Sequence, residues 1–164
     1  YAGMSFVDFA HLKERNIKNG ILDYNRQKTG TPMRLEILDT AELMRKELMG
    51  DKRPASGYLF PFLSGTKTGY EAYLNAALSR FNRNLKALKK AAGIASDVTS
   101  YTIRHSFAMA LKEQNVPIEM ISELLGHKSI KTTQIYLRSF SLEKMTEVNS
   151  TCFGCVYNYV SKVG

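Results

Sequence analysis

Hydrophobic and polar residues alternate with a period of two in one part of the chain, between residues 21 and 37. The alternating apolar positions are Leu22, Tyr24, Met33, Leu35 and Ile37. Such alternation is typical of half-buried strands, and the turn sequence KTGTP separates its two halves. Asn19-Gly20, just before the first half, is a strong signal for a two-residue hairpin turn. The pattern predicts a small antiparallel sheet of three strands, of which the first is short.

Apolar residues recur at helical spacing in most of the remaining chain. Ser5 and Asp8 have the spacing of a capping box, so a short helix is expected to begin there. Further helices are expected over residues 39–50, 73–93, 99–114, 117–126, 129–137 and 141–148. The clearest apolar stripe is Leu74, Leu78, Phe81, Leu85 and Leu88. The expected fold is therefore α+β and mainly helical, with the small sheet near the N-terminus.

Capping residues and glycines set the expected boundaries of these helices. The expected starts are Asp39 or Thr40, Thr99 or Ser100, Pro117 as a first helical residue, and Ser129. The expected ends are Gly50, Gly93 and Gly126. Residues 51–69 are expected to form a loop with one short apolar run at 58–63.

The composition is that of an ordinary soluble domain. The chain has 164 residues, of which 44% are hydrophobic and 23% are charged, so a single domain over residues 1–164 can bury a real core. It contains no apolar run long enough to span a membrane. Tyr1 falls in what reads as the middle of a fold, which indicates a piece of a longer protein.

The chain is strongly basic, with 23 Lys and Arg against 15 Asp and Glu and a formal net charge of +8. For a domain of this size, that charge favours a nucleic acid as partner over plain solubility or a membrane surface. The two cysteines, Cys152 and Cys155, supply only two of the four ligands that a structural zinc needs, and no nearby histidine completes the set. We interpret them as free thiols in a reducing cytoplasm, and we expect no metal.

Arg104 is in line with the apolar stripe of its helix, which consists of Phe107, Ala108 and Leu111. A guanidinium in that position is costly to bury unless an anion meets it. The anion could be a buried carboxylate or a bound phosphate, which a guanidinium grips with two parallel hydrogen bonds.

His127 follows the helix-ending Gly126 and lies nine residues before Tyr136. An ordinary surface histidine and a half-buried tyrosine are the plain interpretation. The alternative is one chemical site, because a turn and a short helix could bring both residues to the same point. A tyrosine with a pKa near 10 is ionised in only about one molecule in a thousand at neutral pH. A tyrosine nucleophile therefore needs cations and hydrogen-bond donors beside the phosphate it attacks.

Two segments resemble the C-terminal catalytic signature of the tyrosine recombinases, the phage and transposon integrase family. They are SYTIRHSFAMAL, with its Arg-His pair, and ISELLGHKSIKTTQIYL, with Leu-Leu-Gly-His followed by Thr-x-x-Tyr. In addition, YNRQKTGTPMRLEIL is similar to the lysine-bearing hairpin of that family, and YAGMSFVDFAHL is similar to its opening helix. The resemblance covers nearly the whole chain.

The resemblance implies a role for four residues. Tyr136 would attack a DNA phosphate, form a 3′-phosphotyrosyl link and release a 5′-hydroxyl. Arg104 would clamp the non-bridging oxygens, and His127 would hydrogen-bond the phosphate. Lys28 would reach into the minor groove and protonate the leaving oxygen, unless it is only a solvated turn lysine. The further expected DNA contacts are Arg26, Arg34, His105, Lys128, Lys131 and Thr132.

The chain departs from the family pattern at two positions. Ser5 stands where the family usually carries a first arginine, and Arg34 or Arg15 could substitute for it. Tyr101 stands where the family often has histidine or lysine, and its hydroxyl could still donate to a phosphate. His105 is interpreted as a supporting or packing residue. For Asp8 a capping role is favoured over the orientation of a basic group.

The predicted function is that of the catalytic domain of a site-specific DNA recombinase or integrase. The missing arginine favours a mobile-element integrase over a host resolution enzyme. The alternatives are a type IB topoisomerase-like activity and a catalytically inactive DNA-binding module of the same fold.

The resemblance also implies partners and surroundings. The expected partner is double-stranded DNA at attachment sites, with no cofactor and no membrane. The expected assembly is a homotetramer on DNA, with a monomer as the isolated form, and with accessory DNA-bending proteins. The expected setting is the bacterial cytoplasm and its nucleoid. An N-terminal DNA-binding domain is expected outside this chain, and the tail at 141–164 would pack on a neighbouring protomer or back on its own domain.

Overall fold

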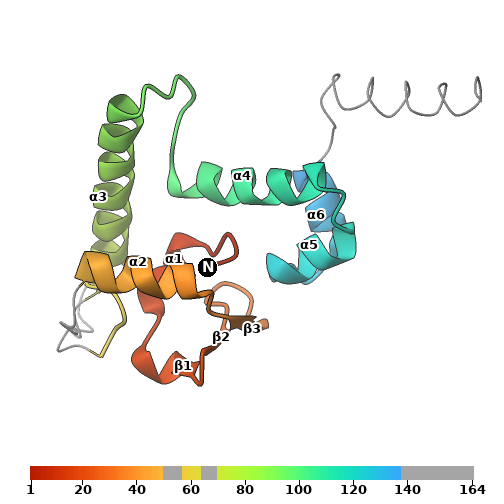
Figure 1. Cartoon of the computed structure of the whole chain (residues 1–164), viewed down its shortest axis with the longest axis horizontal. Helices are drawn as coiled ribbons and strands as arrows, with labels where there is room; N and C mark the ends of the chain where they lie inside the picture. Colours follow the sequence, from red (N-terminus) through yellow and green to blue (C-terminus); the bar gives the residue numbers. More distant parts are fainter. Residues whose placement is uncertain (50–56, 64–69, 138–164) are drawn as a thin grey trace, which may run out of the picture.

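The computed structural model describes residues 1–49, 57–63 and 70–137 (Figure 1). The elements, in chain order, are α1 (Phe6–His11), the 3-10 turn η1 (Glu14–Asn16), β1 (Ile17–Lys18), β2 (Ile21–Asn25), β3 (Pro32–Glu36), α2 (Asp39–Met49), α3 (Tyr70–Ala91), α4 (Ser100–Glu113), α5 (Ile118–Leu124) and α6 (Ile130–Tyr136). The predicted fold class, mainly helical with a small sheet, is confirmed. The helix expected at 141–148, the tail and both cysteines lie outside the described residues.

The three strands form one antiparallel sheet in the order β1-β2-β3. Asn19 and Gly20 both adopt a positive φ, of 51° and 75°, as expected for the tight turn that follows a short first strand. Tyr24 pairs with Met33 across β2 and β3, and both side chains are buried. The predicted sheet and its first turn are therefore confirmed.

One face of this sheet packs under α1 and the segment 57–63. The buried residues of this core cluster are Leu12, Leu22, Tyr24, Met33, Leu59 and Phe60. Phe9 and Phe60 stack with ring centroids 4.2 Å apart. The predicted apolar run at 58–63 thus contributes Leu59 and Phe60 to the core, although it forms no helix or named strand. Burial of each such side chain stabilises the fold by roughly 1.5–3 kcal/mol.

A second cluster joins α1 to α3. Its buried members are Phe6, Ala10, Leu63 and Ala77, with Leu74, Leu78 and Phe81 packed against them. The predicted stripe on α3 is thus confirmed over its first half. It is wrong at Leu88, which is 65% exposed. Among the described residues, the aromatic side chains that pack on α3 come from α1 and 57–63, and their contacts reach no further along the helix than Phe81.

The second half of α4 packs with α5 and α6 in a third cluster, on the side of the molecule away from α3 in the view of Figure 1. Its buried members are Ala108, Ile121, Leu125 and Leu137. The N-terminal segment lies between α4 and the hairpin (Figure 1). This arrangement places the end of α5 beside both the hairpin and the start of the chain.

Ser5 caps α1 as predicted. The later predicted helix starts are confirmed at two positions and need correction at two others. Thr99 caps α4 in a reciprocal capping box with Thr102, and Ser129 holds the cap position of α6 without a side-chain bond. Pro117 is the cap residue of α5 rather than its first residue, because its ψ of 139° is extended. For α2, the Leu38 carbonyl accepts from the Ala41 and Glu42 amides, so the cap position is Leu38 and Asp39 is already helical.

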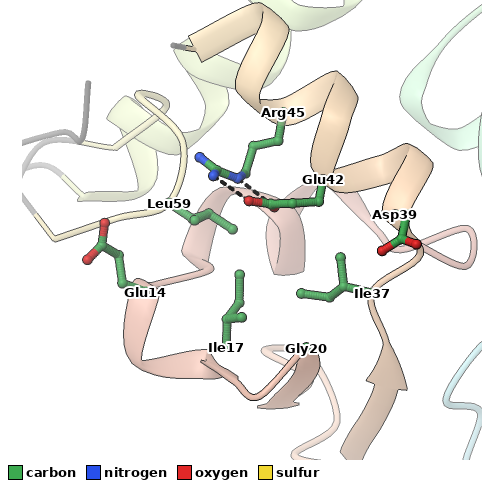
Figure 2. Close-up of a pocket in the computed structure, with 8 residues that line it drawn as sticks. All are labelled: Glu14, Ile17, Gly20, Ile37, Asp39, Glu42, Arg45 and Leu59. Atoms are coloured by element: carbon green, nitrogen blue, oxygen red, sulfur yellow. Dashed lines mark hydrogen bonds and ion pairs between the residues drawn. The ribbon is translucent and has the colours of Figure 1, made fainter. Parts of the chain in front are cut away.

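A hollow of about 490 Å³ lies between η1, the sheet and α2 (Figure 2). Arg45 and Glu42 form an ion pair of 2.6 Å at its wall. The other lining residues are Glu14, Ile17, Gly20, Ile37, Asp39 and Leu59. None of the residues predicted to act on DNA lines this hollow. No helix in the described ranges is both long enough and apolar enough to cross a membrane.

Candidate functional site

Arg104 is a buried cation at the centre of the candidate site. It lies on α4 and is only 9% exposed. Its Nη1 donates to the Gly3 carbonyl at 2.8 Å, and its Nη2 donates to the Leu125 carbonyl at 2.5 Å. Both partners are backbone carbonyls, so the buried carboxylate considered from the sequence is not its direct partner. Burial lowers the pKa of Arg104, and the neighbouring charge of Arg26 lowers it further.

The Gly3 carbonyl reaches Arg104 because the chain comes very close to α4 at this residue. A Cβ on Gly3 would lie 2.6 Å from Cδ1 of Phe107, and Gly3 has a positive φ of 62°. Both features require glycine. Arg104 thus ties together the start of the chain, α4 and the end of α5.

Arg26 is a second buried guanidinium, 8% exposed, at the end of β2. Its Nε donates to Oδ2 of Asp8 at 3.3 Å, and its Nη1 donates to the Gly126 carbonyl at 2.7 Å. Asp8 is itself 2% exposed and also accepts from the Ser5 hydroxyl and the Gln27 amide. The sequence favoured a capping role for Asp8. In the structure the Ser5 hydroxyl caps α1, and the Asp8 carboxylate holds a basic group.

His127 follows Gly126, which has a positive φ of 62°. Its Nδ1 lies 2.8 Å from the hydroxyl of Thr133 on α6. Burial lowers the pKa of His127 to about 4, and the charges of Arg104 and Arg26 contribute to the decrease. The imidazole is therefore neutral at physiological pH.

Tyr136 ends α6 among three other rings. The rings of His105, Tyr101 and His127 meet it edge-on, with centroids 4.9, 5.8 and 6.1 Å away. Its hydroxyl is buried and makes no hydrogen bond of ordinary geometry with the described residues. Burial raises the pKa of Tyr136 to about 12, and the charge of the nearby Tyr101 hydroxyl and a weak hydrogen bond to it raise the pKa further, whereas the charge of Arg104 lowers it.

The structure therefore brings together most of the residues predicted for the site and leaves others on the surface. Those that surround one point are Arg26, Tyr101, Arg104, His105, His127 and Tyr136. Among them Tyr101 is itself exposed, and the residues left on the surface away from this point are Lys28, Arg34, Lys128, Lys131 and Thr132. Lys28 lies in the turn between β2 and β3, and no hydrogen bond or ion pair joins it to the site within the described ranges. Arg15 and Arg34, considered as substitutes for an arginine at Ser5, are both exposed.

Two contacts of the site were not predicted. The partner of His127 is Thr133, for which the sequence carries no distinctive signal. The burial of Arg26 had a signal, because it follows Leu22 and Tyr24 at alternate positions and therefore shares their inward face. No cluster of histidine, cysteine, aspartate or glutamate side chains suited to a metal ion occurs in the part of the chain that the structure describes.

Solved structures of recombinases and integrases have the same fold. The crystal structure of XerA recombinase superimposes with a TM-score of 0.68 at 24% identity, over 92% of this chain and 54% of that chain. The Tn1549 transposon integrase in complex with a circular intermediate DNA gives 0.63 at 15% identity, over 91% of this chain and 55% of that chain. The fold is therefore that of the tyrosine recombinase catalytic domains.

The sequence comparison gives the family. Residues 2–143 match the model of the Phage integrase family, and the chain belongs to that family, as the motifs predicted. It is 52% identical over 54 residues to tyrosine recombinase XerD of Lacticaseibacillus casei, which is 33% of this chain and 18% of that protein. It is 41% identical over 75 residues to tyrosine recombinase XerC of Rickettsia typhi, which is 46% of this chain and 24% of that protein. The matches thus span a quarter or less of these relatives.

Proposed function

We propose that the chain is the catalytic domain of a site-specific DNA recombinase or integrase that cuts and rejoins DNA through a 3′-phosphotyrosyl intermediate. One observation carries the proposal. The hydroxyl of Tyr136 is buried without a hydrogen-bond partner among the described residues, beside the neutral His127 and close enough to Arg104 for that charge to lower its pKa. A buried unpaired hydroxyl costs free energy, so its retention here fits a group that acts on a bound phosphate.

The proposed reaction is a transesterification. The phenol oxygen of Tyr136 forms a bond to the DNA phosphorus, and the bond from phosphorus to the 5′-oxygen breaks. The phenol proton passes to water or to a neighbouring imidazole, and the leaving oxygen gains a proton and becomes a 5′-hydroxyl. One phosphodiester replaces another, so the reverse reaction with a different 5′-hydroxyl rejoins the strand.

Arg104 and His127 stabilise the charge that develops on the phosphate. The guanidinium of Arg104 is held in place by two carbonyls before DNA binds, which spares reorganisation during the reaction. His127 is neutral, so it carries a single N–H. We assign this proton to Nε2, with Thr133 donating to Nδ1, so that the ring can donate to a non-bridging oxygen.

Lys28 is the proposed acid for the leaving oxygen. It is exposed at the hairpin turn between β2 and β3, and DNA bound across the site would meet that turn. The exposed Lys128 lies in the turn after His127, and the exposed Lys131 and Thr132 lie in the first turn of α6; all three would contact phosphates. Phosphate contacts of this kind make binding fall steeply with salt.

The remaining expectations for the whole protein are also proposals. These are binding to duplex attachment sites as a homotetramer, docking of the tail on a neighbouring protomer, accessory DNA-bending proteins, a mobile-element origin and action at the nucleoid. The circular intermediate DNA held by the Tn1549 integrase in its solved complex supports DNA as the partner.

The experiment that tests the proposal is covalent trapping. The complete protein is incubated without magnesium on a duplex of its own recombination site. A nick close to the cleaved phosphate lets the short fragment that carries the released 5′-hydroxyl diffuse away. We expect a denaturation-resistant protein–DNA adduct with the native protein and with Tyr101→Phe, and none with Tyr136→Phe. Binding of DNA without an adduct in any of the three proteins would replace the proposal with an inactive DNA-binding module.

A further inference from the structure

We propose that Arg26 is a second phosphate-binding guanidinium of this site, supplied by the β2–β3 hairpin where Ser5 offers no charge. The inference rests on the proposed function and adds a residue to it. The position of Arg26, the charge balance of the site and the contacts of the side chain each support it.

The two guanidinium groups are held by consecutive residues. Arg104 donates to the carbonyl of Leu125, and Arg26 donates to the carbonyl of Gly126. The next residue is His127, whose pKa both arginines lower. The end of α5 therefore places two buried cations and the imidazole around one point.

The charges of this buried group do not balance. Arg26 and Arg104 are cations, and the one buried carboxylate within the described part of the site is Asp8. His127 is neutral, and Tyr136 keeps its proton because its pKa is raised to about 12. A buried excess of one positive charge is costly unless an anion offsets it. A phosphodiester carries one negative charge, which is the charge that the site lacks.

The contacts of Arg26 leave room for such an anion. Asp8 binds Nε and Gly126 binds Nη1, while no hydrogen bond to the described residues involves Nη2. Nη2 therefore keeps both of its protons and can donate charge-assisted hydrogen bonds to phosphate oxygens. Asp8 is in turn held by the Ser5 hydroxyl and the Gln27 amide, so it acts as a positioning residue for Arg26.

The close packing of Arg26 on Gly126 fixes the direction of the side chain. A Cβ at Gly126 would lie 2.5 Å from Cδ of Arg26 and 2.6 Å from Sδ of Met33. The stem of the arginine therefore runs directly over the residue between the Leu125 carbonyl and His127. A purely structural pin between the hairpin and α1 would need only the bond to Asp8.

The test compares two substrates that differ in charge at the cleaved position. Nicked duplexes of the recombination site carry either the normal phosphate or a methylphosphonate, in which a neutral methyl group replaces one non-bridging oxygen. In both, the tyrosine oxygen bonds to phosphorus and the same 5′-oxygen leaves. A guanidinium that neutralises the phosphate is needed on the first substrate and dispensable on the second.

The variants are Arg26→Ala and Arg26→Lys in the complete protein, with Arg45→Ala as control. Arg45 is a buried arginine paired with the partly exposed Glu42 in the separate hollow of Figure 2, so its loss reports the effect of removing a buried arginine and its ion pair outside the site. We expect Arg26→Ala to slow adduct formation by about 100-fold or more on the phosphate. On the methylphosphonate its rate should come within a few-fold of the native protein. Arg45→Ala should leave the ratio of the two rates unchanged.

Loss of the adduct on both substrates would show that Arg26 only pins the hairpin, and native rates on both would show that it does not act. Either result overturns the inference. Thermal melting establishes that each variant is folded. If Arg26→Ala unfolds, the test relies on Arg26→Lys. Its adduct formation should be slowed more on the phosphate than on the methylphosphonate. Equal slowing on the two substrates would overturn the inference. The native protein on the phosphate substrate tests the proposed function separately.

Discussion

The Nδ1 atom of His127 and the hydroxyl of Thr133 lie 2.8 Å apart, and this bond joins the turn after α5 to the helix that carries Tyr136. Thr133 is fully buried and stands three residues before Tyr136, on the same helix. The bond therefore fixes the imidazole relative to the phenol before any DNA is present. The nine-residue spacing seen in the sequence becomes one rigid unit of turn and helix.

We expect Thr133→Val to separate this positioning from folding. Valine keeps the shape of threonine but removes the hydroxyl, which costs about 0.5–1.5 kcal/mol for one hydrogen bond and releases the ring of His127. Adduct formation should slow while the protein stays folded, as measured by trapping rates and urea denaturation. Thr133→Ser keeps the hydroxyl and should keep most of the rate. Equal rates for Val and Ser would show that the bond does not orient the histidine.

The lowered pKa of His127 predicts how stability depends on pH. Its pKa is about 4 in the folded protein and 6.5 as a free group, so the unfolded chain binds more protons between these values. The corresponding stability is fully present above pH 6.5 and is lost as the pH falls toward 4. We expect the urea midpoint to fall through this window, and His127→Gln to flatten that part of the profile. An unchanged profile in the variant would place the acid sensitivity elsewhere.

Removal of the Tyr136 hydroxyl should cost no stability. The hydroxyl is buried and makes no hydrogen bond of ordinary geometry to the described residues, so phenylalanine fills the same space without an unpaired polar group. We expect Tyr136→Phe to unfold at the same or a higher urea concentration than the native protein. A loss above about 1 kcal/mol would reveal a hydrogen bond that the proposed site does not contain.

Gly126→Ala should disturb both the backbone and Arg26. A positive φ costs a residue with a side chain about 1–2 kcal/mol, and the new Cβ would displace the stems of Arg26 and Met33. Gly93→Ala is the matched control, because Gly93 has a φ of 66° and a Cβ there meets nothing within 4 Å. We expect Gly126→Ala to lose more stability than Gly93→Ala and to slow adduct formation, whereas the control should keep its rate. Equal losses would show that Arg26 adapts freely.

Local signals in the sequence were sufficient for the sheet and for the helix caps that use side chains. Asn19-Gly20 is such a signal because its positive φ values are a property of two residues alone, and Thr99 is another. The exposure of Leu88 could not be predicted, because it depends on where the aromatic residues of α1 and the segment 57–63 end along α3.

The residues of the site also divide into those that the sequence could locate and those whose contacts depend on the fold. The motif spacing located Arg104, His127 and Tyr136, and the structure brings these three side chains around one point. The arrangement of Arg26 could not be predicted from spacing, because its partners Asp8 and Gly126 are 18 and 100 residues away. Its inward-facing position directly after β2 was the available signal, and only the folded chain shows which groups it meets there.

The most direct test of the central claim is to identify the residue that holds the DNA. The adduct trapped on the nicked duplex is digested with nuclease and trypsin, and the modified peptide is located by mass spectrometry. We expect a nucleotide joined through its 3′-phosphate to the tryptic peptide of residues 132–138, TTQIYLR, in which Tyr136 is the only tyrosine. A modification on the neighbouring Tyr101, or on any other residue, would contradict the account.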